Sequence, residues 1–188
     1  MNCNIDEILN LVAEENKLAK EILGKHEVWR TIKQFPNYQV SSFGNVKSLV
    51  TGGTIMKPSQ HKDGYYQLGL WKNKKVMMLV HRLVAIEFIP NILNKASVDH
   101  IDHNPKNNNI SNLRWATVQE NNRNTQQYKN NKSGFIGVSY HKQHKQWCAQ
   151  INIKGKRKHI GLFPTAEQAS EAYQERAKKL YGEFYNSK

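Results

Sequence analysis

Residues 98–122 place acids, imidazoles and carboxamides between apolar side chains that are too sparse to form an ordinary core element. The stretch begins with VDHIDHNPKNNNISNLRWAT at residues 98–117 and ends with Glu120, Asn121 and Asn122. A polar, asparagine-rich loop is the plain interpretation, and a reactive site is the alternative. In either case the chain must build its core elsewhere and fold it around this segment.

The composition points to small modules and to a polyanionic partner. Hydrophobic residues make up 38% of the 188-residue chain, which favours several small modules over one large core. Lys and Arg outnumber Asp and Glu by 28 to 15, and residues 129–188 alone carry 12 basic and 4 acidic side chains. We therefore expect nucleic acid as the partner, with the strongest attraction near the C-terminus.

The sequence also predicts where the protein works. Cys3 and Cys148 are too few for a disulfide framework or a cysteine-built zinc site, which favours a reducing compartment. No apolar run approaches the roughly 20 residues needed to cross a bilayer, and acids interrupt the N-terminus where a signal peptide would be apolar. We expect a soluble intracellular protein without a membrane partner, in the cytoplasm of a bacterial or virus-infected host.

The N-terminal region combines a helical pattern with a β pattern. Residues 4–23 carry apolar side chains near helical spacing, with Asn4 as the cap and Gly24 as the end. This pattern predicts a helix that packs against the protein or dimerises, so we expect a monomer or a homodimer. Short β-prone runs broken by turn residues predict a small sheet within residues 26–60.

A hairpin and a short helix lead into the polar stretch. Apolar and polar side chains alternate within residues 64–80, which predicts two strands joined by a basic turn. Residues 81–88 predict a helix, which Ile89 and Pro90 close.

The polar stretch itself supplies the parts that phosphodiester hydrolysis needs. Asp99 and His100 point to opposite faces of a strand, yet both can border one cleft where a hairpin bends. Thr117 can cap a helix with Glu120 at the capping-box position, which would turn Asn121 back toward Asp99. A neutral histidine suits a general base, and Mg²⁺, or alternatively Mn²⁺, accepts a carboxylate and a carboxamide as ligands.

Five short motifs in this region occur in the order found in one nuclease family. They are HRLVA at 81–85, FIPN at 88–91, VDHID at 98–102, NLRW at 112–115 and EN at 120–121. The region resembles the HNH (ββα-metal) motif, in the His-Asn-Asn form of intron and phage homing endonucleases.

The resemblance implies a role for each polar residue. His100 would be the general base, and Asp99 and Asn121 would be the metal ligands. Asn112 would complete the catalytic set, mainly by orienting the loop and the imidazole. Many relatives have Gly at the position of His103, for which a turn role and a catalytic or DNA-contacting role both stay open.

The segment before the hairpin carries a second pattern. Trp29 is followed by YQVSSFGNVKS at residues 38–48. This arrangement resembles a small module that is often attached to homing nucleases.

Residues 133–188 predict a small domain of three strands and one helix. The strands are expected at 134–140, 146–153 and 158–163, and Thr165 is expected to cap the helix. The sequences GV at 137, WCAQI at 147, GLF at 161 and TAEQA at 165 resemble the APETALA2-type DNA-binding domain, which implies a sheet that lies against DNA. The candidate DNA contacts of the whole chain are Arg114, Arg123, Lys132, His141, Lys142, Lys145, Trp147, Lys154, Lys156, Arg157 and Lys158.

Together these patterns predict an α+β chain made of small modules. The expected divisions are a helix (1–25), a β module (26–60), an HNH nuclease domain (61–124), a linker (125–132) and a DNA-binding domain (133–188). The function that they favour is a site-specific homing endonuclease that hydrolyses double-stranded DNA with one divalent metal. The alternative is a DNA-binding regulator that keeps an inactive HNH fold, and the sequence leaves open whether one strand or both are cut.

Overall fold

The structure, a computed structural model, describes residues 5–123, 131–153 and 155–185. It divides into two compact units, Met1–Val118 and Gln119–Lys188, and each unit has a hydrophobic core of its own. Small sheets and helices occur in both, which confirms the α+β prediction. Within the described part of the chain, no helix has the length and apolar character that crossing a membrane requires.

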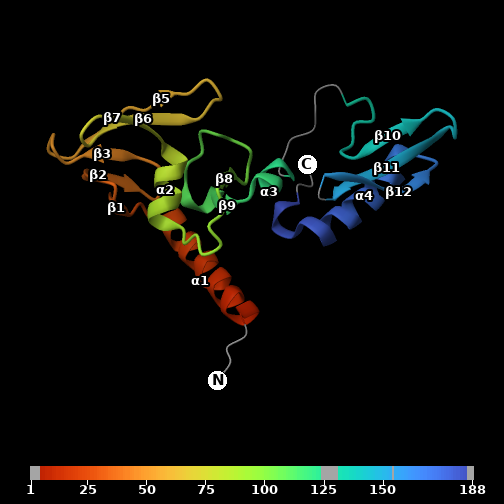
Figure 1. Cartoon of the computed structure of the whole chain (residues 1–188), viewed down its shortest axis with the longest axis horizontal. Helices are drawn as coiled ribbons and strands as arrows, with labels where there is room; N and C mark the ends of the chain where they lie inside the picture. Colours follow the sequence, from red (N-terminus) through yellow and green to blue (C-terminus); the bar gives the residue numbers. More distant parts are fainter. Residues whose placement is uncertain (1–4, 124–130, 154, 186–188) are drawn as a thin grey trace. The chain divides into compact units, whose positions relative to one another are not determined.

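The first unit contains a four-stranded sheet, a three-stranded sheet and a two-stranded hairpin (Figure 1). The four-stranded sheet has the order β1-β2-β3-β4, and the three-stranded sheet has the order β5-β6-β7. The elements of this unit are α1 (Ile5–Lys25), β1 (Trp29–Ile32), β2 (Phe35–Ser41), β3 (Val46–Ser48), β4 (Thr54–Ile55), β5 (Ser59–Gln60), β6 (Tyr66–Trp71), β7 (Lys75–Leu79), α2 (Val80–Phe88), β8 (Ser97–His100), the 3₁₀ helix η1 (Ile110–Asn112) and β9 (Leu113–Ala116).

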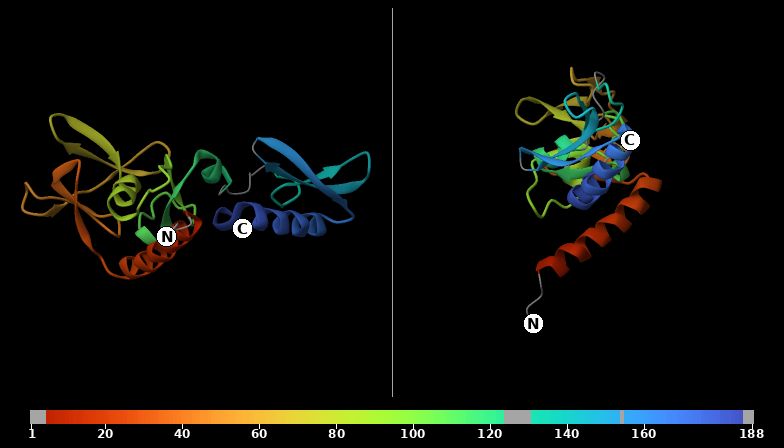
Figure 2. Two further views of the ribbon diagram at one scale, coloured as in Figure 1. Left: turned by 60° about the horizontal axis from the view of Figure 1, so that its bottom comes forward. Right: turned by 90° about the vertical axis from the view of Figure 1, so that its right-hand side faces the viewer.

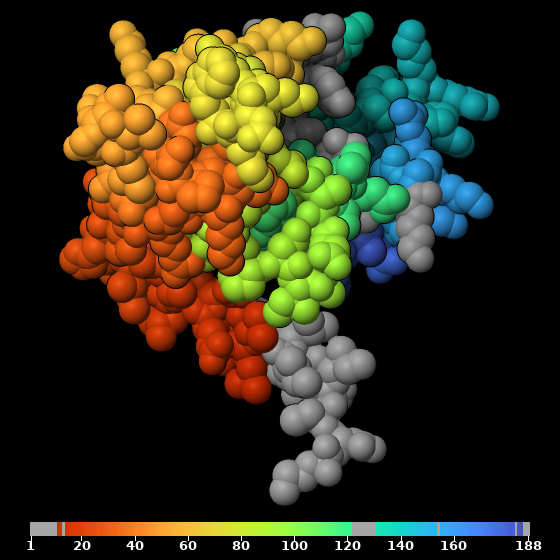
Figure 3. Space-filling view, turned by 60° about the vertical axis from the view of Figure 1, so that its left-hand side comes forward, coloured from red at the N-terminus to blue at the C-terminus, as the bar shows by residue number. Residues whose placement is uncertain are grey.

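Helix α2 lies at the centre of this unit and joins its sheets into one core. Leu83 and Val84 of α2 are fully buried, together with Val40 of β2, Leu70 of β6 and Leu113 of β9. Residues 26–60 and residues 61–118 therefore share a single core. In Figure 3, the strands of both sheets and the segment after α2 form one continuous surface.

Helix α1 extends beyond the sheets, and its C-terminal end contacts η1 (Figure 1 and Figure 2). The sequence predicts that Gly24 ends this helix, but the helix continues to Lys25. Gly24 has a packing role instead: a Cβ at this position would lie 3.0 Å from the Cβ of Ser111, so the glycine lets α1 approach η1 closely. The predicted cap, Asn4, lies outside the described residues.

The second unit is a three-stranded antiparallel sheet covered by one helix. Its elements are α3 (Val118–Arg123, which begins at the boundary), β10 (Val138–His141), β11 (Gln146–Ile153), β12 (Lys156–Phe163), α4 (Ala166–Tyr181) and the 3₁₀ helix η2 (Gly182–Phe184). Thr165 caps α4 as predicted, because its hydroxyl accepts a hydrogen bond from the backbone N–H of Gln168 at 3.3 Å. Ala149 and Ala169 are fully buried between sheet and helix. Leu180, near the C-terminal end of α4, is exposed.

Candidate active site

The hairpin of β8 and β9 sets the positions of the polar residues that the sequence analysis selected. Its antiparallel register pairs Asp99 with Arg114 and His100 with Leu113. Asp99 and His100 are both buried, although each is a polar residue at the end of a strand. Buried polar groups need partners, and the partners of these two residues define the site.

Asp99 is held by a buried ion pair. The carboxylate oxygen Oδ2 accepts a hydrogen bond from Nε of Arg114 at 2.8 Å, and Nη2 of the same guanidinium lies 2.7 Å from it. Both contacts end on one oxygen of the carboxylate. Arg114 is only 8% exposed and its charge faces Asp99, and its DNA contact stays a prediction.

His100 is held by Asn108, a residue that the sequence analysis did not select. The Nε2 atom of His100 lies 3.3 Å from Oδ1 of Asn108, whose Nδ2 donates to the carbonyl of Lys106. With Oδ1 of Asn108 toward the ring, this contact favours the tautomer that carries its proton on Nε2 and its basic lone pair on Nδ1.

The environment keeps His100 in its neutral form. Burial lowers the pKa of His100 below its ordinary value, and this effect outweighs the hydrogen bond with Asn108 and the charges of Asp102 and Asp99, which all raise it. A general base must be unprotonated to accept a proton. The burial of His100 therefore favours that role at neutral pH.

Two further rings surround the imidazole of His100. The ring of His81, on α2, meets it edge-on with centroids 5.0 Å apart, and the ring of Tyr65 stacks on it at 5.8 Å. Tyr65 also contacts His81, at 4.8 Å. Burial, followed by the charges of His100 and Arg82, lowers the pKa of His81 to about 3, so this ring is also neutral. Among the described residues its buried Nδ1 has no hydrogen-bond partner, so packing against the two other rings is what holds His81 here.

Asn112 organises the loop that follows His100. Its Nδ2 donates to Oδ1 of Asp102 at 2.8 Å and to the carbonyl of Asn107 at 2.9 Å, while its Oδ1 accepts from the backbone N–H of Asp102 at 3.0 Å. Burial alone would raise the pKa of Asp102, but hydrogen bonds from Asn107, the Asn104 backbone and Asn112 lower it overall. This geometry supports the loop-orienting role predicted for Asn112, whereas the imidazole is held by Asn108.

His103 occupies the turn of the same loop. Its φ is +61°, in the left-handed region that glycine adopts most easily, and its N–H donates to the carbonyl of His100 at 3.0 Å. This conformation explains why a glycine would suit the position, and it favours the turn role.

The loop is supported from two other elements of the first unit. The backbone N–H of Ile110 donates to the carbonyl of Ser42 at 2.8 Å. A Cβ on Gly44 would lie only 2.5 Å from the Cβ of Asn108, so the turn after β2 presses directly against the partner of His100. From α1, Nζ of Lys20 donates to the carbonyl of Leu113 at 2.7 Å.

The donor atoms suit a hard divalent cation. Asp99 offers a carboxylate whose Oδ2 is oriented by Arg114, and Asn121 on α3 would add a carboxamide oxygen. Asn121 belongs to the second unit, so its approach to Asp99 stays a prediction. Within the described ranges, no group of three or more His, Cys, Asp or Glu side chains is arranged to hold a metal.

The predicted DNA contacts of the second unit fall into three groups. Six of them are exposed: Lys132, Lys142, Lys145, Lys156, Arg157 and Lys158. Two are partly buried, since His141 packs on His144 at 4.7 Å and Trp147 packs edge-on to Tyr140 at 5.2 Å. Lys154 lies outside the described residues, and so does the side chain of Arg123.

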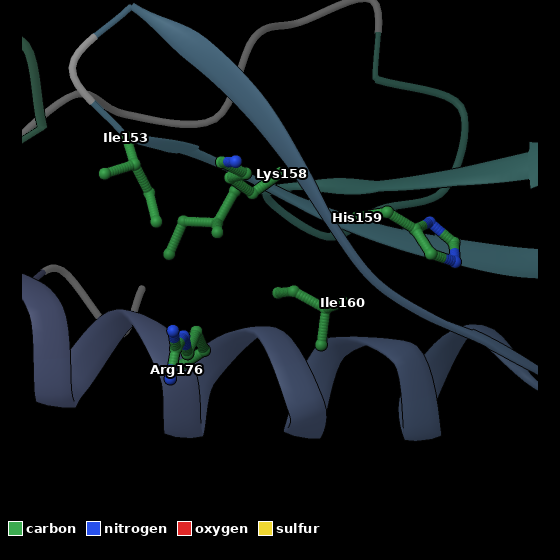
Figure 4. Close-up of a pocket in the computed structure, with 6 residues that line it drawn as sticks. Ile153, Lys158, His159, Ile160 and Arg176 are labelled. Carbon is green, nitrogen blue, oxygen red and sulfur yellow. The ribbon is translucent and has the colours of Figure 1, made fainter.

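Lys158 differs from the other strand lysines. It lines a cavity of about 510 Å³ between the sheet and α4, together with Arg176 (Figure 4). Lys158 is nevertheless exposed, like Lys156 and Arg157 before it on β12. The DNA-contacting roles of all these residues stay predictions.

Comparison with known proteins places this geometry in a family. A family model described as HNH endonuclease matches residues 78–123, which contain Asp99, His100, Asn112 and Asn121. A second model, the NUMOD4 motif, matches residues 27–71 and supports the predicted nuclease-associated module.

Several viral proteins are similar in sequence. DNA endonuclease I-HmuI of Bacillus phage SP01 is 44% identical over 95 residues, which are 50% of this chain and 54% of that protein. Uncharacterized HNH endonuclease L560 of Acanthamoeba polyphaga mimivirus is 37% identical over 127 residues, which are 65% of this chain and 62% of that protein. Protein 3.8 of Escherichia phage T7 is 34% identical over 87 residues, which are 46% of this chain and 71% of that protein.

This chain is also similar to a solved structure that describes DNA binding and cleavage by the HNH homing endonuclease I-HmuI. It is 30% identical, with a TM-score of 0.48, over 82% of this chain and 91% of the solved one. In the sequence matches the chain spans about half of the I-HmuI length and smaller shares of two mimivirus relatives. The matched residues, with His100 and Asp99 buried side by side on β8, show that the chain belongs to the HNH endonuclease family.

Proposed function

We propose that this protein is a homing-type DNA endonuclease that hydrolyses phosphodiester bonds with one divalent metal and a histidine general base. The observation that carries the proposal is the buried His100, whose pKa is lowered and whose Nε2 lies 3.3 Å from Oδ1 of Asn108, directly beside the buried carboxylate of Asp99. A residue that served only packing would not need an adjacent anion and a carboxamide turned to accept its Nε2 proton.

In this proposal each residue of the chain has one task. His100 accepts a proton at Nδ1 from the attacking water, while Asn108 retains the proton on Nε2. His81 and Tyr65 confine the plane of the ring, and Asn112 holds the loop that carries Asn108. Asp99 and Asn121 are the residues that would hold the metal, with Mg²⁺ or Mn²⁺ as the fitting ions. When bound, such a metal stabilises the negative charge that develops on the leaving oxygen.

DNA affinity would come chiefly from the basic second unit. Residues 129–188 carry 12 basic side chains against 4 acidic ones, and the exposed lysines on and beside its sheet suit phosphate contacts. The APETALA2-like recognition of a DNA groove by this sheet is part of the proposal. The proposed setting is the cytoplasm of a bacterial or virus-infected host, where the protein acts as a monomer or a homodimer on double-stranded DNA.

The deciding experiment is cleavage of a supercoiled plasmid library with random inserts, in Mg²⁺ or Mn²⁺, with sequencing of the new ends on both strands. His100→Ala should lower the single-turnover rate about 10²–10⁴-fold and leave DNA binding intact. The matched control is His144→Ala, which removes an exposed histidine of the second unit and should cleave normally. A protein that binds DNA but cuts no member of the library would instead be the DNA-binding regulator.

A further inference from the structure

One buried nitrogen beside the proposed base has no partner. Among the described residues, Nδ1 of His81 is the one buried side-chain nitrogen or oxygen that no hydrogen bond satisfies. An unpaired buried polar atom destabilises a folded protein, so its presence in a native structure calls for an explanation. His81 is 5% exposed, and its ring lies 5.0 Å from the ring of His100. A phenylalanine could pack against His100 and Tyr65 and would leave no polar atom unpaired.

The unpaired atom indicates which nitrogen of His81 carries the proton. Among backbone groups, a buried acceptor without a partner is commoner than a buried donor without one. The same cost in a side chain favours the tautomer with a bare Nδ1 and a proton on Nε2. Nε2 is not among the buried unpaired atoms, and no hydrogen bond joins it to a described residue. It is therefore the ring nitrogen that a ligand can reach, and it presents an N–H beside His100.

We infer that His81, besides confining the ring of His100, is a catalytic residue whose Nε2–H donates a hydrogen bond to a non-bridging oxygen of the scissile DNA phosphate. The inference deepens the proposed function and rests on it. The rings of His81 and His100 are adjacent, so a phosphate whose attacking water meets His100 can also reach His81. A donor placed there stabilises the negative charge of the phosphate in the transition state.

A neutral donor suits this position better than a cation. His100 gains a positive charge when it accepts its proton, and a cation 5.0 Å away would oppose that step. Burial, followed by the charges of His100 and Arg82, lowers the pKa of His81 to about 3, so its ring is neutral at neutral pH. His81 therefore stabilises the phosphate without weakening the base.

The test uses two substitutions that divide the properties of His81 between them. His81→Phe keeps an aromatic ring and removes both nitrogens, whereas His81→Gln removes the ring and keeps an N–H donor near the position of Nε2. His81→Phe should lower the single-turnover cleavage rate about 10²–10³-fold. Its thermal midpoint should stay equal or rise by about 2–10 °C, because the unpaired nitrogen is gone. His81→Gln should cleave faster than His81→Phe, although it packs less well.

A residue that only packs predicts the opposite order of rates. His81→Phe cleaving as fast as the unmodified protein, or at least as fast as His81→Gln, would overturn the inference. All rates are measured below the thermal midpoints of both variants. The matched control is His144→Phe, the same exchange at an exposed histidine of the second unit, which should cleave normally.

A second measurement does not need the glutamine variant, which gives up the ring contacts with His100 and Tyr65. It uses target duplexes that carry sulfur in place of either non-bridging oxygen of the scissile phosphate, cleaved in Mn²⁺. Sulfur accepts hydrogen bonds weakly. One of the two diastereomers should therefore slow the unmodified protein at least about threefold more than it slows His81→Phe. Equal sulfur effects in both proteins, with both diastereomers, would contradict the inference.

The two proposals fail in distinguishable ways. Loss of the endonuclease proposal would appear as an absence of cleavage by the unmodified protein in the plasmid screen. Full-rate cleavage by His81→Phe would remove only the role of His81 and would leave His100 as the base.

Discussion

At the scale of single residues, the site consists of one imidazole whose properties are each fixed by a different neighbour. Asn108 selects the tautomer of His100, and the rings of His81 and Tyr65 restrict its plane. Burial lowers its pKa. Because these causes are separate, substitutions should separate them as well.

The first prediction concerns the pH dependence of cleavage. Only neutral His100 can accept a proton, so the single-turnover rate should fall with acid only below the lowered pKa, at a pH under about 6.5. The hydrogen bond with Asn108 raises the pKa of His100. Asn108→Ala should therefore move the acidic fall to still lower pH, and it should also reduce the maximal rate because the tautomer is no longer selected. An acidic fall centred above about 6.5 would exclude a buried His100 as the base.

The second prediction concerns His103, for which the sequence leaves two roles open. Its φ of +61° costs an L-residue about 1–2 kcal/mol. A glycine avoids this cost, but it loses more conformational entropy on folding, which offsets part of the gain in stability. His103→Gly should therefore leave the free energy of unfolding unchanged or raise it by up to about 1 kcal/mol, as measured by urea denaturation, with cleavage intact. A loss of cleavage at full stability would show that the imidazole serves the reaction.

The sequence predicts the reactive residues better than it predicts their partners. Asp99, His100 and Asn112 stand out because their types and order match one chemistry. Asn108 does not, since it is one of five asparagines between residues 104 and 112, and only the folded loop decides which carboxamide reaches the imidazole. The pairing of Arg114 with Asp99 is hidden for a similar reason: it depends on a hairpin register that a long connecting loop does not fix.

At the scale of elements, the sequence predicts those helices and strands that depend on interactions between residues close together in the chain. The helix predicted at 81–88 forms as α2, and the strand predicted at 146–153 forms as β11. Gly24 shows the limit, since a glycine that ordinarily ends a helix here lies within the last turn of α1 because η1 packs against it. A contact between residues 24 and 111 leaves no trace in either local sequence.

The third prediction concerns the contact between the turn after β2 and the site loop. Gly44 and Gly53 have nearly equal φ values, +88° and +87°, but only Gly44 has a neighbour, with Asn108 at 2.5 Å from an added Cβ. Gly53→Ala should cost about 1–2 kcal/mol in unfolding free energy from backbone strain alone. Gly44→Ala should cost about 1–3 kcal/mol more because the alanine overpacks the loop, and it should slow cleavage by displacing Asn108. Equal effects of the two substitutions, in thermal unfolding and in cleavage, would contradict this support of the site.

At the scale of the whole molecule, charge and chemistry are divided between the two units. The first unit holds the Asp99, His100 and Arg114 cluster, whereas the six cationic side chains that are exposed among the described DNA-contact candidates all belong to the second unit. Their charge was evident from composition alone. Which lysine lies next to α4 was not, because only the fold places Lys158 at the cavity that Arg176 of α4 also lines.

The fourth prediction uses this difference. Each phosphate contact contributes about 0.9 to the slope of log affinity against log salt concentration. Lys142→Gln should reduce that slope by about 0.9, whereas Lys158→Gln should reduce it by less because Lys158, although also exposed, lines the cavity that Arg176 of α4 lines. Fluorescence anisotropy over a salt series measures both. Identical slopes for the two variants would show that the outer face of the sheet is not the side that meets DNA.

The support of the site by Ser42 and Gly44 has a consequence for how the protein comes into being. These residues leave the ribosome about 70 residues before Arg114, which at about 5–20 residues per second is an interval of roughly 4–14 s. For most of it the turn after β2 exists without the loop that it will hold, and His100 is synthesised before the arginine that pairs with Asp99. An interrupted chain that stops short of residue 114 therefore contains the base but not the assembled site, so translation must pass this point before the nuclease can exist.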